Sequence, residues 1–456
     1  MATTEAPSAA REQRRAEDAL LSVRDLRTHF DVRGSFVDRL LGRQAGFVKA
    51  VNGVSFELRR GEVLGLVGES GSGKTTLGRS LLGLVPATSG EILFRGRDLT
   101  KLGAGELREV RKDVQMVFQD PHASLNPAMT IGQAVAHPLR IHGMSDSSAA
   151  MRRSVSLVLE RVGLVPVDQF VDKYPSDLSG GQKQRAVIAR AIIVAPSLVV
   201  ADEPVSMLDM SVRAKILELM LSLKDDLDLT YLYITHDLAT AKFFCDRIAI
   251  MYLGQIVEIG PSEAIYRDPK HPYTQALLKA IPEPDPQKTV PRDLPRGEVP
   301  DAVTPPLGCP FHPRCPHAFE LCGWESRDLA DLLEARWTRV SEGELERERD
   351  AVGDLKALET PSTIARLGTE GRAGEAAEVM RKLRGDDLEE PLWKGVRAVR
   401  ENGRVEVEFE DPVDPRLLPA DEVEVACHLY DDEVREQARR AAEQAGREPS
   451  PESRRA

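Results

Sequence analysis

The sequence predicts an α/β fold, because strand-like and helical segments alternate from residue 20 to about residue 260. Two further observations locate the centre of that fold. The short apolar segment Val63–Val67 leads into a glycine-rich loop, and a helical pattern follows over Thr75–Leu84. A second apolar segment, Leu198–Ala201, ends in two acidic residues. A strand, a glycine loop and a helix in this order predict a site that binds phosphate groups.

The composition is ordinary for a globular protein and argues against several other classes. The chain has 456 residues, of which 41% are hydrophobic and 29% charged, enough for one large core and a further unit. Its formal net charge of -12 argues against a nucleic-acid-binding surface, which is normally basic. No apolar run approaches the roughly 18 residues of a membrane-spanning helix, and residues 1–18 lack the apolar region of a secretory signal. We therefore expect a cytoplasmic protein that reaches a membrane only through partner subunits.

Apolar runs of strand length define the expected sheets. Phe47–Leu58 alternates apolar and polar residues, which predicts an antiparallel strand. Four further strands are expected at Asp113–Phe118, Leu198–Ala201, Tyr231–Ile234 and Arg247–Tyr252. Between residues 120 and 178 the pattern becomes helical. Its clearest segment is Ser147–Val162, with Ser145 or Asp146 as the expected N-cap.

The glycine loop matches the pattern GxxxxGK[ST] of nucleoside triphosphate sites. The residues expected to bind the nucleoside triphosphate are Gly68, Glu69, Ser70, Gly71, Ser72, Gly73, Lys74, Thr75 and Thr76. Glycines allow the backbone to turn tightly, so that its N–H groups point at phosphate oxygens. Lys74 places a cation on the β- and γ-phosphates, and the Thr75 hydroxyl is a magnesium ligand.

The acidic pair supplies the second half of the expected nucleotide site. Asp202 is expected to hold magnesium, directly or through water, because this ion prefers hard oxygen ligands. Glu203, one residue further at the strand end, points in another direction and can orient and polarise an attacking water.

Other motifs narrow the class of nucleotide-binding protein. Leu178-Ser179-Gly180-Gly181-Gln182 lies between the glycine loop and the acidic pair, and Ser206-Met207-Leu208-Asp209 follows them. With these motifs the chain resembles the ATP-binding subunits of ABC transporters, and more closely those of oligopeptide and dipeptide importers. His271-Pro272-Tyr273-Thr274-Gln275-Ala276-Leu277-Leu278 is typical of the latter. The resemblance covers about residues 20–322 and resumes at Cys427.

The resemblance implies a fold and roles for particular residues. The fold is a P-loop NTPase cassette, with a RecA-like core, an antiparallel β subdomain, a helical subdomain at about 120–178 and a cysteine-bearing C-terminal extension. Glu203 corresponds to the catalytic carboxylate. Gln119 would contact magnesium and the attacking water, His236 would contact the γ-phosphate, and Asp209 belongs to the D-loop. Four residues would contact ATP held by the other protomer of a head-to-tail pair: Ser179, Gly180, Gly181 and Gln182.

The expected organisation has five parts. They are a disordered tail at 1–19, an ATPase domain at 20–260, a peptide-importer C-terminal region at 261–322, a charged insertion at 323–421, and a returning cysteine segment with a tail at 422–456. Residues 282–306 are rich in proline and charge, which predicts a linker or an extended segment. Within the insertion, Ser362–Leu383 has an amphipathic pattern, and Arg404–Glu410 alternates like an edge strand.

Four of the five cysteines form a candidate metal site. Cys245 is expected to be a small core residue. Cys309, Cys315 and Cys322 are separated by five and six residues, and Cys427 follows after 104 more. Grouped thiols in a reducing compartment favour a metal over disulfides. Four thiolates suit tetrahedral zinc or an iron–sulfur cluster, and ordinary packing is the third alternative. The resemblance associates this region with a four-iron four-sulfur cluster.

The leading hypothesis is an ATPase subunit of an importer for oligopeptides or dipeptides, with ATP and Mg²⁺ as ligands. The resemblance implies a second, related ATPase subunit in a heterodimer, two transmembrane permease subunits, and indirectly an extracytoplasmic binding protein. It places the subunit at the cytoplasmic face of the membrane. A same-family importer of nickel, a sugar or another solute remains open, as does a non-transport ABC ATPase. Phe30 and Phe47 are both candidates for adenine stacking or for the core.

Overall fold

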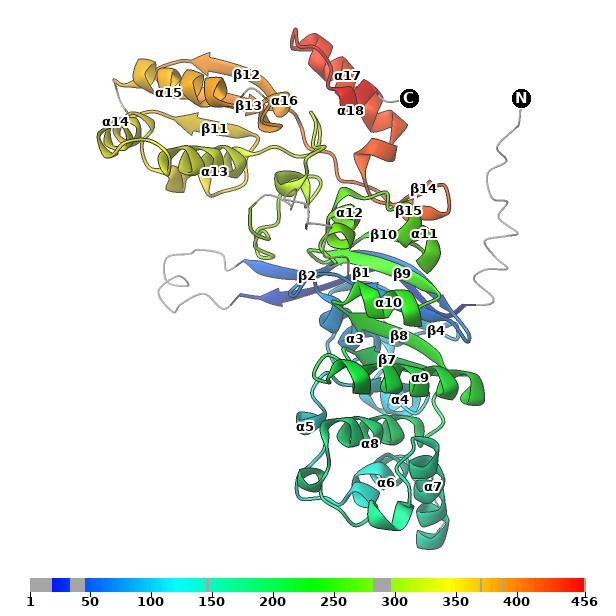
Figure 1. Cartoon of the computed structure of the whole chain (residues 1–456). Coiled ribbons are helices and arrows are strands. Elements are labelled where there is room, and N and C mark those ends of the chain that lie inside the picture. Colours follow the sequence, from blue (N-terminus) through cyan, green and yellow to red (C-terminus); the bar gives the residue numbers. More distant parts are fainter. Residues whose placement is uncertain are drawn as a thin grey trace, which may run out of the picture. The chain divides into compact units, whose positions relative to one another are not determined.

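The computed structural model describes residues 19–32, 46–144, 147–281, 297–369, 371–387 and 389–454 (Figure 1). The chain divides into two compact units. The first comprises Met1–Asp31 and Lys49–Arg267, and the second comprises Val32–Val48 and Asp268–Ala456. In the expected tail at 1–19, Ala19 begins a strand, and residues 1–18 lie outside the described residues.

The first unit carries an antiparallel sheet with the strand order β2-β1-β4-β5. Its strands are β1 (Ala19–Asp31), β2 (Phe47–Arg59), β4 (Ser89–Phe94) and β5 (Arg97–Asp98). The strand expected at Phe47–Leu58 is therefore confirmed. In β2, Val54, Phe56 and Leu58 are buried and alternate with positions that contact solvent, as in a sheet with one covered face.

A second sheet of the first unit runs in the order β10-β9-β3-β8-β7-β6. Its strands are β3 (Val63–Val67), β6 (Val114–Val117), β7 (Leu198–Asp202), β8 (Thr230–Thr235), β9 (Arg247–Tyr252) and β10 (Gln255–Pro261). Neighbours from β9 to β6 are parallel, and β10 joins β9 antiparallel. Every residue of β3, β7 and β8 is buried, as expected for strands covered on both faces. All five apolar strands expected in this region are confirmed.

Helices and short 3-10 turns complete the core of the first unit. They are α3 (Lys74–Leu81), η1 (Leu99–Lys101), α4 (Ala104–Val110), α9 (Met210–Leu227), α10 (Leu238–Phe244) and α11 (Ser262–Arg267). Helix α3, which follows the glycine loop, contacts β7 and β8. Gly78 permits this close approach, because a Cβ there would lie 2.8 Å from the Ile234 side chain.

The segment expected to be helical is helical. It contains α5 (Pro121–Ser124), α6 (Ile131–Ile141), α7 (Ser148–Arg161), η2 (Val167–Gln169) and η3 (Pro175–Asp177), and α8 (Gly180–Ile192) follows. Helix α8 contacts α5, α6 and α7. The expected N-cap of α7 was wrong: the Ser147 hydroxyl caps it, accepting a hydrogen bond of 3.1 Å from the Ala150 N–H. Ser145 and Asp146 lie outside the described residues.

The second unit contains a folded region where the sequence predicted a charged insertion. Its elements before the small sheet are α12 (Pro272–Lys279), η4 (His312–Arg314), α13 (Ser326–Trp337), α14 (Glu342–Val352) and η5 (Leu355–Leu358). The sheet region has β11 (Ile364–Leu367), α15 (Ala373–Asp386), α16 (Leu392–Gly395), β12 (Val396–Glu401) and β13 (Val405–Phe409). The unit ends with β14 (Leu418–Ala420), β15 (Val423–Val425), η6 (His428–Tyr430), α17 (Asp432–Gln444) and α18 (Pro451–Arg454).

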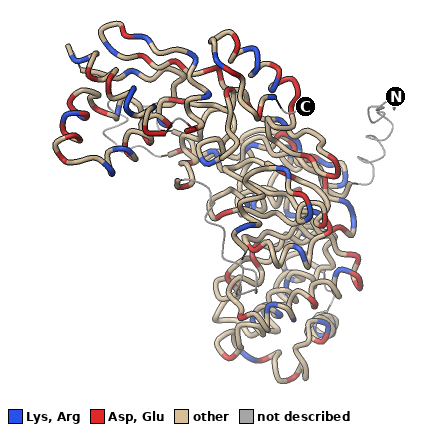
Figure 2. Tube along the Cα trace, turned by 45° about the horizontal axis from the view of Figure 1, so that its top comes forward, with Lys and Arg blue, Asp and Glu red and all other residues tan. Residues whose placement is uncertain are grey.

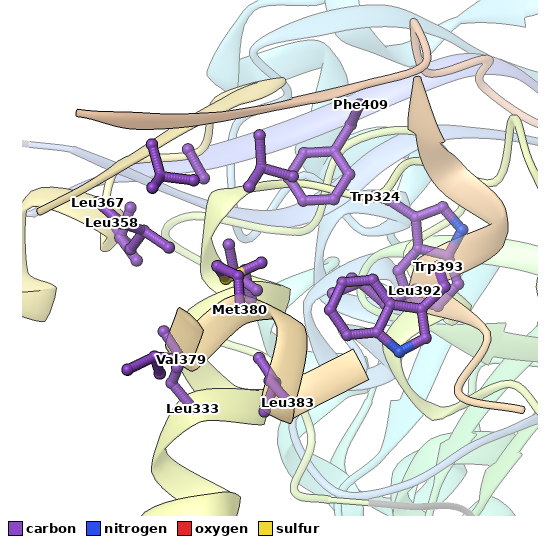
Figure 3. Close-up of a cluster of buried hydrophobic side chains, with 14 of the residues drawn as sticks. Trp324, Leu333, Leu358, Leu367, Val379, Met380, Leu383, Leu392, Trp393 and Phe409 are labelled. Carbon is purple, nitrogen blue, oxygen red and sulfur yellow. The ribbon is translucent and has the colours of Figure 1, made fainter. Parts of the chain in front are cut away.

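The inserted region contributes most of an apolar core that also includes residues before and after it, such as Phe319 and Ala438 (Figure 3). Phe409 on the sheet, Met380 on α15 and Leu333 on α13 belong to one buried cluster. Trp324 also packs closely, because a Cβ on Gly395 would lie only 1.9 Å from its ring. The high charge of the sequence therefore belongs to the outer surfaces of a folded unit, and Figure 2 shows basic and acidic residues interspersed along it.

One expectation for the insertion was wrong. Strand β13 is the central strand of an antiparallel sheet with the order β11-β13-β12, not an edge. Its alternation arises because Val405, Val407 and Phe409 are buried on one face, while Glu406 and Glu408 on the other face pair with arginines of the neighbouring strands. The amphipathic segment Ser362–Leu383 is divided between β11 and α15.

The structure also bears on two other expectations, the linker at 282–306 and the lack of a membrane-spanning helix. Of the expected linker, residues 297–306 form neither helix nor strand, and residues 282–296 lie outside the described residues. Among the described helices, none combines the length and the apolar character needed to cross a bilayer.

Candidate functional site

The glycine loop connects β3 to α3 and wraps around the ammonium group of Lys74. This group donates hydrogen bonds to the carbonyl oxygens of Gly68 and Glu69, both at 2.8 Å, and approaches the Ser72 hydroxyl at 3.2 Å. Lys74 is 5% exposed, and burial lowers its pKa against the opposing effect of nearby carboxylates. Gly73 adopts a φ of 98°, and a Cβ there would lie 1.9 Å from the Ala50 carbonyl oxygen.

The remaining residues of the loop line its outer side and the first turn of the helix. Ser70 and Gly71 are exposed, whereas Glu69, Thr75 and Thr76 are partly buried. A loop with exposed backbone at the N-terminus of a helix can accept an anion, because the helix dipole and free N–H groups favour negative charge.

Asp202 lies at the end of β7, directly against the loop. Its Oδ1 accepts a hydrogen bond of 3.1 Å from the Thr75 hydroxyl. The residue is 1% exposed, and desolvation raises the pKa of its carboxyl group, with a further contribution from Glu203. A buried carboxylate beside a hydroxyl is an arrangement that a hard divalent cation can use.

Glu203 is the residue on which two other expected functional groups converge. Gln119 Nε2 donates a hydrogen bond of 3.0 Å to Glu203 Oε2, and His236 Nδ1 lies 3.1 Å from Glu203 Oε1. The Glu203 backbone has a φ of 45°, and its N–H donates to the Ile234 carbonyl oxygen at 2.9 Å. This left-handed conformation is rare for a residue with a side chain and is often found at functional sites.

Strand topology explains why these distant residues meet. Lys74 follows β3 and Gln119 follows β6. Asp202 ends β7, Glu203 comes directly after it, and His236 follows β8. These strands are neighbours in the order β3-β8-β7-β6 and run parallel. Their carboxyl ends therefore lie along one edge of the sheet, where ligands of open α/β sheets bind.

The LSGGQ residues form the N-terminus of α8. Ser179 is its N-cap, and the Ser179 N–H donates to Gln182 Oε1 at 3.0 Å, while the Gln182 N–H approaches the Ser179 hydroxyl at 3.4 Å. Gly181 packs tightly, because a Cβ there would lie 2.6 Å from Val212. Ser179 and Gly180, at the very start of the helix, are exposed.

The D-loop precedes α9, which Asp209 caps by accepting a hydrogen bond of 3.0 Å from the Val212 N–H. Met207 and Met210 beside it are 61% and 85% exposed.

From the sequence, Phe30 and Phe47 were candidates either for stacking on adenine or for packing in the core. They are 41% and 54% exposed, so neither is a core residue.

Comparison with known proteins identifies the family. The family model described as ABC transporter matches residues 51–206, and the one described as oligopeptide/dipeptide transporter, C-terminal region, matches residues 257–322. The oligopeptide transport ATP-binding protein OppF of Salmonella typhimurium is 45% identical over 305 residues, which are 66% of this chain and 90% of that protein. This chain belongs to the ABC transporter family.

Two further relatives agree with this assignment. The oligopeptide transport ATP-binding protein AppF of Bacillus subtilis is 45% identical over 309 residues, 67% of this chain and 92% of that protein. The protein OppF of Haemophilus influenzae is 44% identical over 308 residues, with the same coverage of 67% and 92%. About a third of this ABC transporter chain thus lies outside each alignment.

The second unit of this ABC transporter chain brings its four candidate cysteines to one cavity. The lining residues are His271, Pro272, Cys309, Phe311, His312, Cys315, His317, Phe319, Cys322, Cys427, His428 and Leu429. Cys309 and Cys322 are joined by a backbone hydrogen bond of 2.9 Å. Gly323 allows the chain to leave beside Leu307, because a Cβ there would lie 1.9 Å from that carbonyl oxygen. The folded insertion therefore starts beside this cavity and returns to it at Cys427.

The cysteines lining this cavity are free thiols. Burial raises the pKa of Cys309 to about 11 and that of Cys315 to about 12, and it raises the pKa of Cys322 well above its usual range. Among the described residues, no group of three or more histidine, cysteine or acidic side chains is arranged to hold a metal ion. The metal site expected from the spacing is thus not supported by the side-chain arrangement, although the thiols share one cavity.

Sequence reasoning missed the histidines of this cavity. His312 Nδ1 lies 2.9 Å from the Cys309 carbonyl oxygen, and its Nε2 lies 3.0 Å from Asp328 in α13. His271 Nδ1 accepts a hydrogen bond of 3.0 Å from the Tyr273 N–H and caps α12. His271 and His428 stand in segments that served only for the resemblance to the family, so their position beside the cysteines was not predicted.

The fifth cysteine, Cys245, was expected in the core, and it is buried in the first unit.

Proposed function

We propose that this chain is the ATP-hydrolysing subunit of an ABC importer that takes up oligopeptides or dipeptides. The observation that carries the proposal is the convergence of Gln119 and His236 on the Glu203 carboxylate, at the sheet edge that also holds the Lys74 loop. The match of residues 257–322 to the C-terminal region of oligopeptide/dipeptide transporters, and the names of the relatives, support the choice of peptide as cargo.

In this proposal the loop residues Gly68 to Thr76 bind the phosphates of ATP, with Lys74 moving from its carbonyl partners to the β- and γ-phosphates. Thr75, Asp202 and Gln119 would hold Mg²⁺, which supplies charge neutralisation of the phosphates. The raised pKa of Asp202 supports this role, because a nearby cation stabilises the carboxylate form that burial disfavours.

Hydrolysis requires a water that attacks the γ-phosphorus while the bond to the β–γ bridging oxygen breaks. Glu203 would orient and polarise this water, and His236 would contact the γ-phosphate. Gln119 and His236 hold the carboxylate from two sides, which fixes its direction before substrate arrives. The products are ADP and inorganic phosphate.

A single chain would supply only part of each working site. Ser179, Gly180, Gly181 and Gln182 would contact ATP bound by a partner cassette, which we propose to be a related but different ATPase subunit. Asp209 and the exposed Met207 and Met210 would face the same partner. Residues 120–178 would dock on two permease subunits at the cytoplasmic face of the membrane, and the extracytoplasmic binding protein would act indirectly.

We also propose that Cys309, Cys315, Cys322 and Cys427 hold a four-iron four-sulfur cluster, with zinc as the alternative. The support is the donor set: four thiols of one unit line one cavity. Ligation would require deprotonation of the thiols and a rearrangement of their side chains, since their present arrangement is not that of a metal site. The role would be structural or in partner docking.

The test of the function is reconstitution in proteoliposomes with the permease subunits, the partner ATPase and the binding protein that co-purify from native membranes. ATP hydrolysis that a short peptide stimulates, with uptake of labelled peptide, is the expected result. Stimulation by nickel or a sugar instead would assign another cargo. Hydrolysis with no membrane partner at all would favour an ABC ATPase outside transport.

A further inference from the structure

Arg213, near the start of α9, joins two loops of the nucleotide site. Its Nη1 donates a hydrogen bond of 3.2 Å to Asp237 Oδ2, and its Nη2 donates a longer one of 3.4 Å to the Leu208 carbonyl oxygen. Asp237 directly follows His236, and Leu208 belongs to the D-loop. One guanidinium group therefore fastens the segment that carries His236 to the loop that follows Glu203.

The Asp237 carboxylate is oriented from two directions. Its Oδ1 caps α10 by accepting a hydrogen bond of 2.9 Å from the Ala239 N–H, whereas its Oδ2 faces Arg213. The Asp237 N–H also donates to the Thr235 hydroxyl at 3.0 Å. Both side chains of the ion pair are only 31% exposed, so solvent screens it less than a pair on the open surface. The ion pair therefore holds the start of α10 against the start of α9.

The place of the His236 side chain depends on this support. The side chain is 56% exposed, so packing holds it little, and its Nδ1 lies 3.1 Å from Glu203 Oε1. Because His236 directly precedes Asp237, a contact that fixes Asp237 also fixes the backbone from which the imidazole extends. A misplacement of about 1 Å at a reacting group can cost about a hundredfold in rate.

The same contacts close a circuit that begins and ends at Glu203. The loop after Glu203 turns back on itself, with the Ser206 hydroxyl donating a hydrogen bond of 3.1 Å to the Glu203 carbonyl oxygen. The loop then reaches Arg213 at the Leu208 carbonyl oxygen. Through Asp237, Arg213 leads on to the histidine that faces the Glu203 carboxylate. The D-loop and the histidine are thus connected by one side chain.

We propose that Arg213 is a positioning residue that holds His236 in place for ATP hydrolysis. It acts through Asp237, and its contact with the Leu208 carbonyl oxygen makes the placement depend on the D-loop. This inference rests on the proposed function, in which the histidine contacts the γ-phosphate and the D-loop faces a partner cassette. Arginine suits the role, because its planar fork presents several donors in fixed directions, whereas lysine offers a single flexible charge.

The experiment measures steady-state ATP hydrolysis by the full chain, assembled with the subunits that co-purify from native membranes. The variants are Arg213→Met, Arg213→Lys, Asp237→Asn and, as the control on an exposed position of the same helix, Lys215→Met. We expect Arg213→Met to lower kcat about tenfold, with KM and nucleotide affinity within about twofold of the parent, because the Lys74 loop is unchanged. Arg213→Lys should recover part of kcat, and Lys215→Met should match the parent.

The double variant Arg213→Met with Asp237→Asn gives the sharper test. Asparagine can still cap α10, so Asp237→Asn removes mainly the ion pair. If the two residues act as one unit, the double variant is no slower than the slower single variant. Losses in kcat that multiply overturn the inference, because they show that Arg213 acts independently of Asp237.

Two other results would also overturn it. One is a kcat of Arg213→Met equal to that of the parent or of Lys215→Met, and the other is a loss of ATP affinity in place of kcat. If Arg213→Met does not fold, Arg213→Lys and Asp237→Asn decide, and both must then lower kcat at unchanged nucleotide affinity. Unchanged variants of an active parent overturn the inference and leave the proposed function standing. A parent complex that hydrolyses no ATP overturns both.

Discussion

The side-chain amide of Gln119 donates a hydrogen bond of 3.0 Å to the Glu203 carboxylate, although the two residues are 84 positions apart in the chain. Gln119 lies in the short segment between β6 and α5. Asp120, the next residue, caps α5 by accepting a hydrogen bond of 2.7 Å from the His122 N–H. The carboxylate at the sheet edge is therefore linked directly to the start of the helical segment. In the proposed function, a change at Glu203 on nucleotide binding would reach that segment through the Gln119 side chain.

The first prediction concerns hydrolysis. Glu203→Gln should retain ATP binding and lower turnover by at least a hundredfold, which is about 2.7 kcal/mol of barrier, because the amide cannot polarise water as a carboxylate does. Phosphate release and equilibrium nucleotide binding measure the two effects. Glu218→Gln, on the exposed side of α9, is the control and should behave as the parent chain. Near-normal turnover in Glu203→Gln would assign the catalytic role to another group.

The second prediction separates the two halves of the composite site. Ser179→Arg should leave ATP binding to the isolated chain intact, because Lys74 and its loop are unchanged. In the assembled pair it should block hydrolysis at the partner's nucleotide, since the N-terminus of α8 no longer accommodates a phosphate. Fluorescent-nucleotide titration of the isolated chain and hydrolysis by the pair check these outcomes. Loss of affinity in the isolated, folded chain would contradict the arrangement.

The third prediction follows from the raised pKa of Asp202. In the folded chain this carboxyl holds its proton more readily than in the unfolded chain. The neutral form contributes stability that is present at low pH and is lost as the pH rises through the folded-state pKa. Asp202→Asn, which stays neutral, should therefore have a higher melting temperature than the parent chain at pH 7 without nucleotide. The gap should narrow as the pH falls, and Mg²⁺-dependent ATPase activity should be lost.

Calorimetry or thermal fluorescence scans across the pH range, in the absence of divalent cations, measure this difference. A parent chain as stable as Asp202→Asn at pH 7 would mean that the Thr75 hydroxyl and nearby cations already compensate the buried charge.

The nucleotide site was largely predictable because its residues stand in short motifs that follow buried strands. Val63–Val67 and Arg247–Tyr252 were located residue by residue, since fully buried parallel strands give continuous apolar runs. The partner contacts of Glu203 were not predictable from spacing alone. They depend on which strands are neighbours, and the order β3-β8-β7-β6 is not the order of the sequence.

The insertion was harder to predict, and the reason lies in its sheet. A strand with one solvated face alternates in the same way whether it lies at the edge or in the centre, so Val405–Phe409 gave no signal of its two neighbours. Nor could the spacing of the cysteines place Cys427 beside Cys322. Their proximity depends on a folded unit whose chain enters and leaves at the same point.

The fourth prediction tests the core of that unit. Phe409→Ala removes a side chain with no exposed surface from the cluster around Met380, and should cost about 3–5 kcal/mol of stability. Limited proteolysis should then cleave within residues 323–421, while ATP binding by the first unit persists. Val399→Ala, on the neighbouring strand and 50% exposed, is the control and should change stability little. Equal proteolysis of both variants would argue against a role of this apolar core in holding residues 323–421 folded.

The last prediction concerns the proposed metal site, with Cys427→Ser as the change and Cys245→Ser as the control. Both residues are buried cysteines, but Cys427 lines the cavity of the second unit, whereas Cys245 belongs to the first unit. Anaerobically purified parent chain should absorb broadly near roughly 400 nm and contain about four iron and four sulfide per chain, as four-cysteine ligation of a cubane cluster implies.

Cys427→Ser should lower this iron and sulfide content and expose the C-terminal segment to protease, with only a small effect on ATP affinity. Cys245→Ser should keep the full metal content. Stoichiometric zinc without iron would assign a structural zinc site, and equal metal content in the two variants would remove Cys427 from the ligand set.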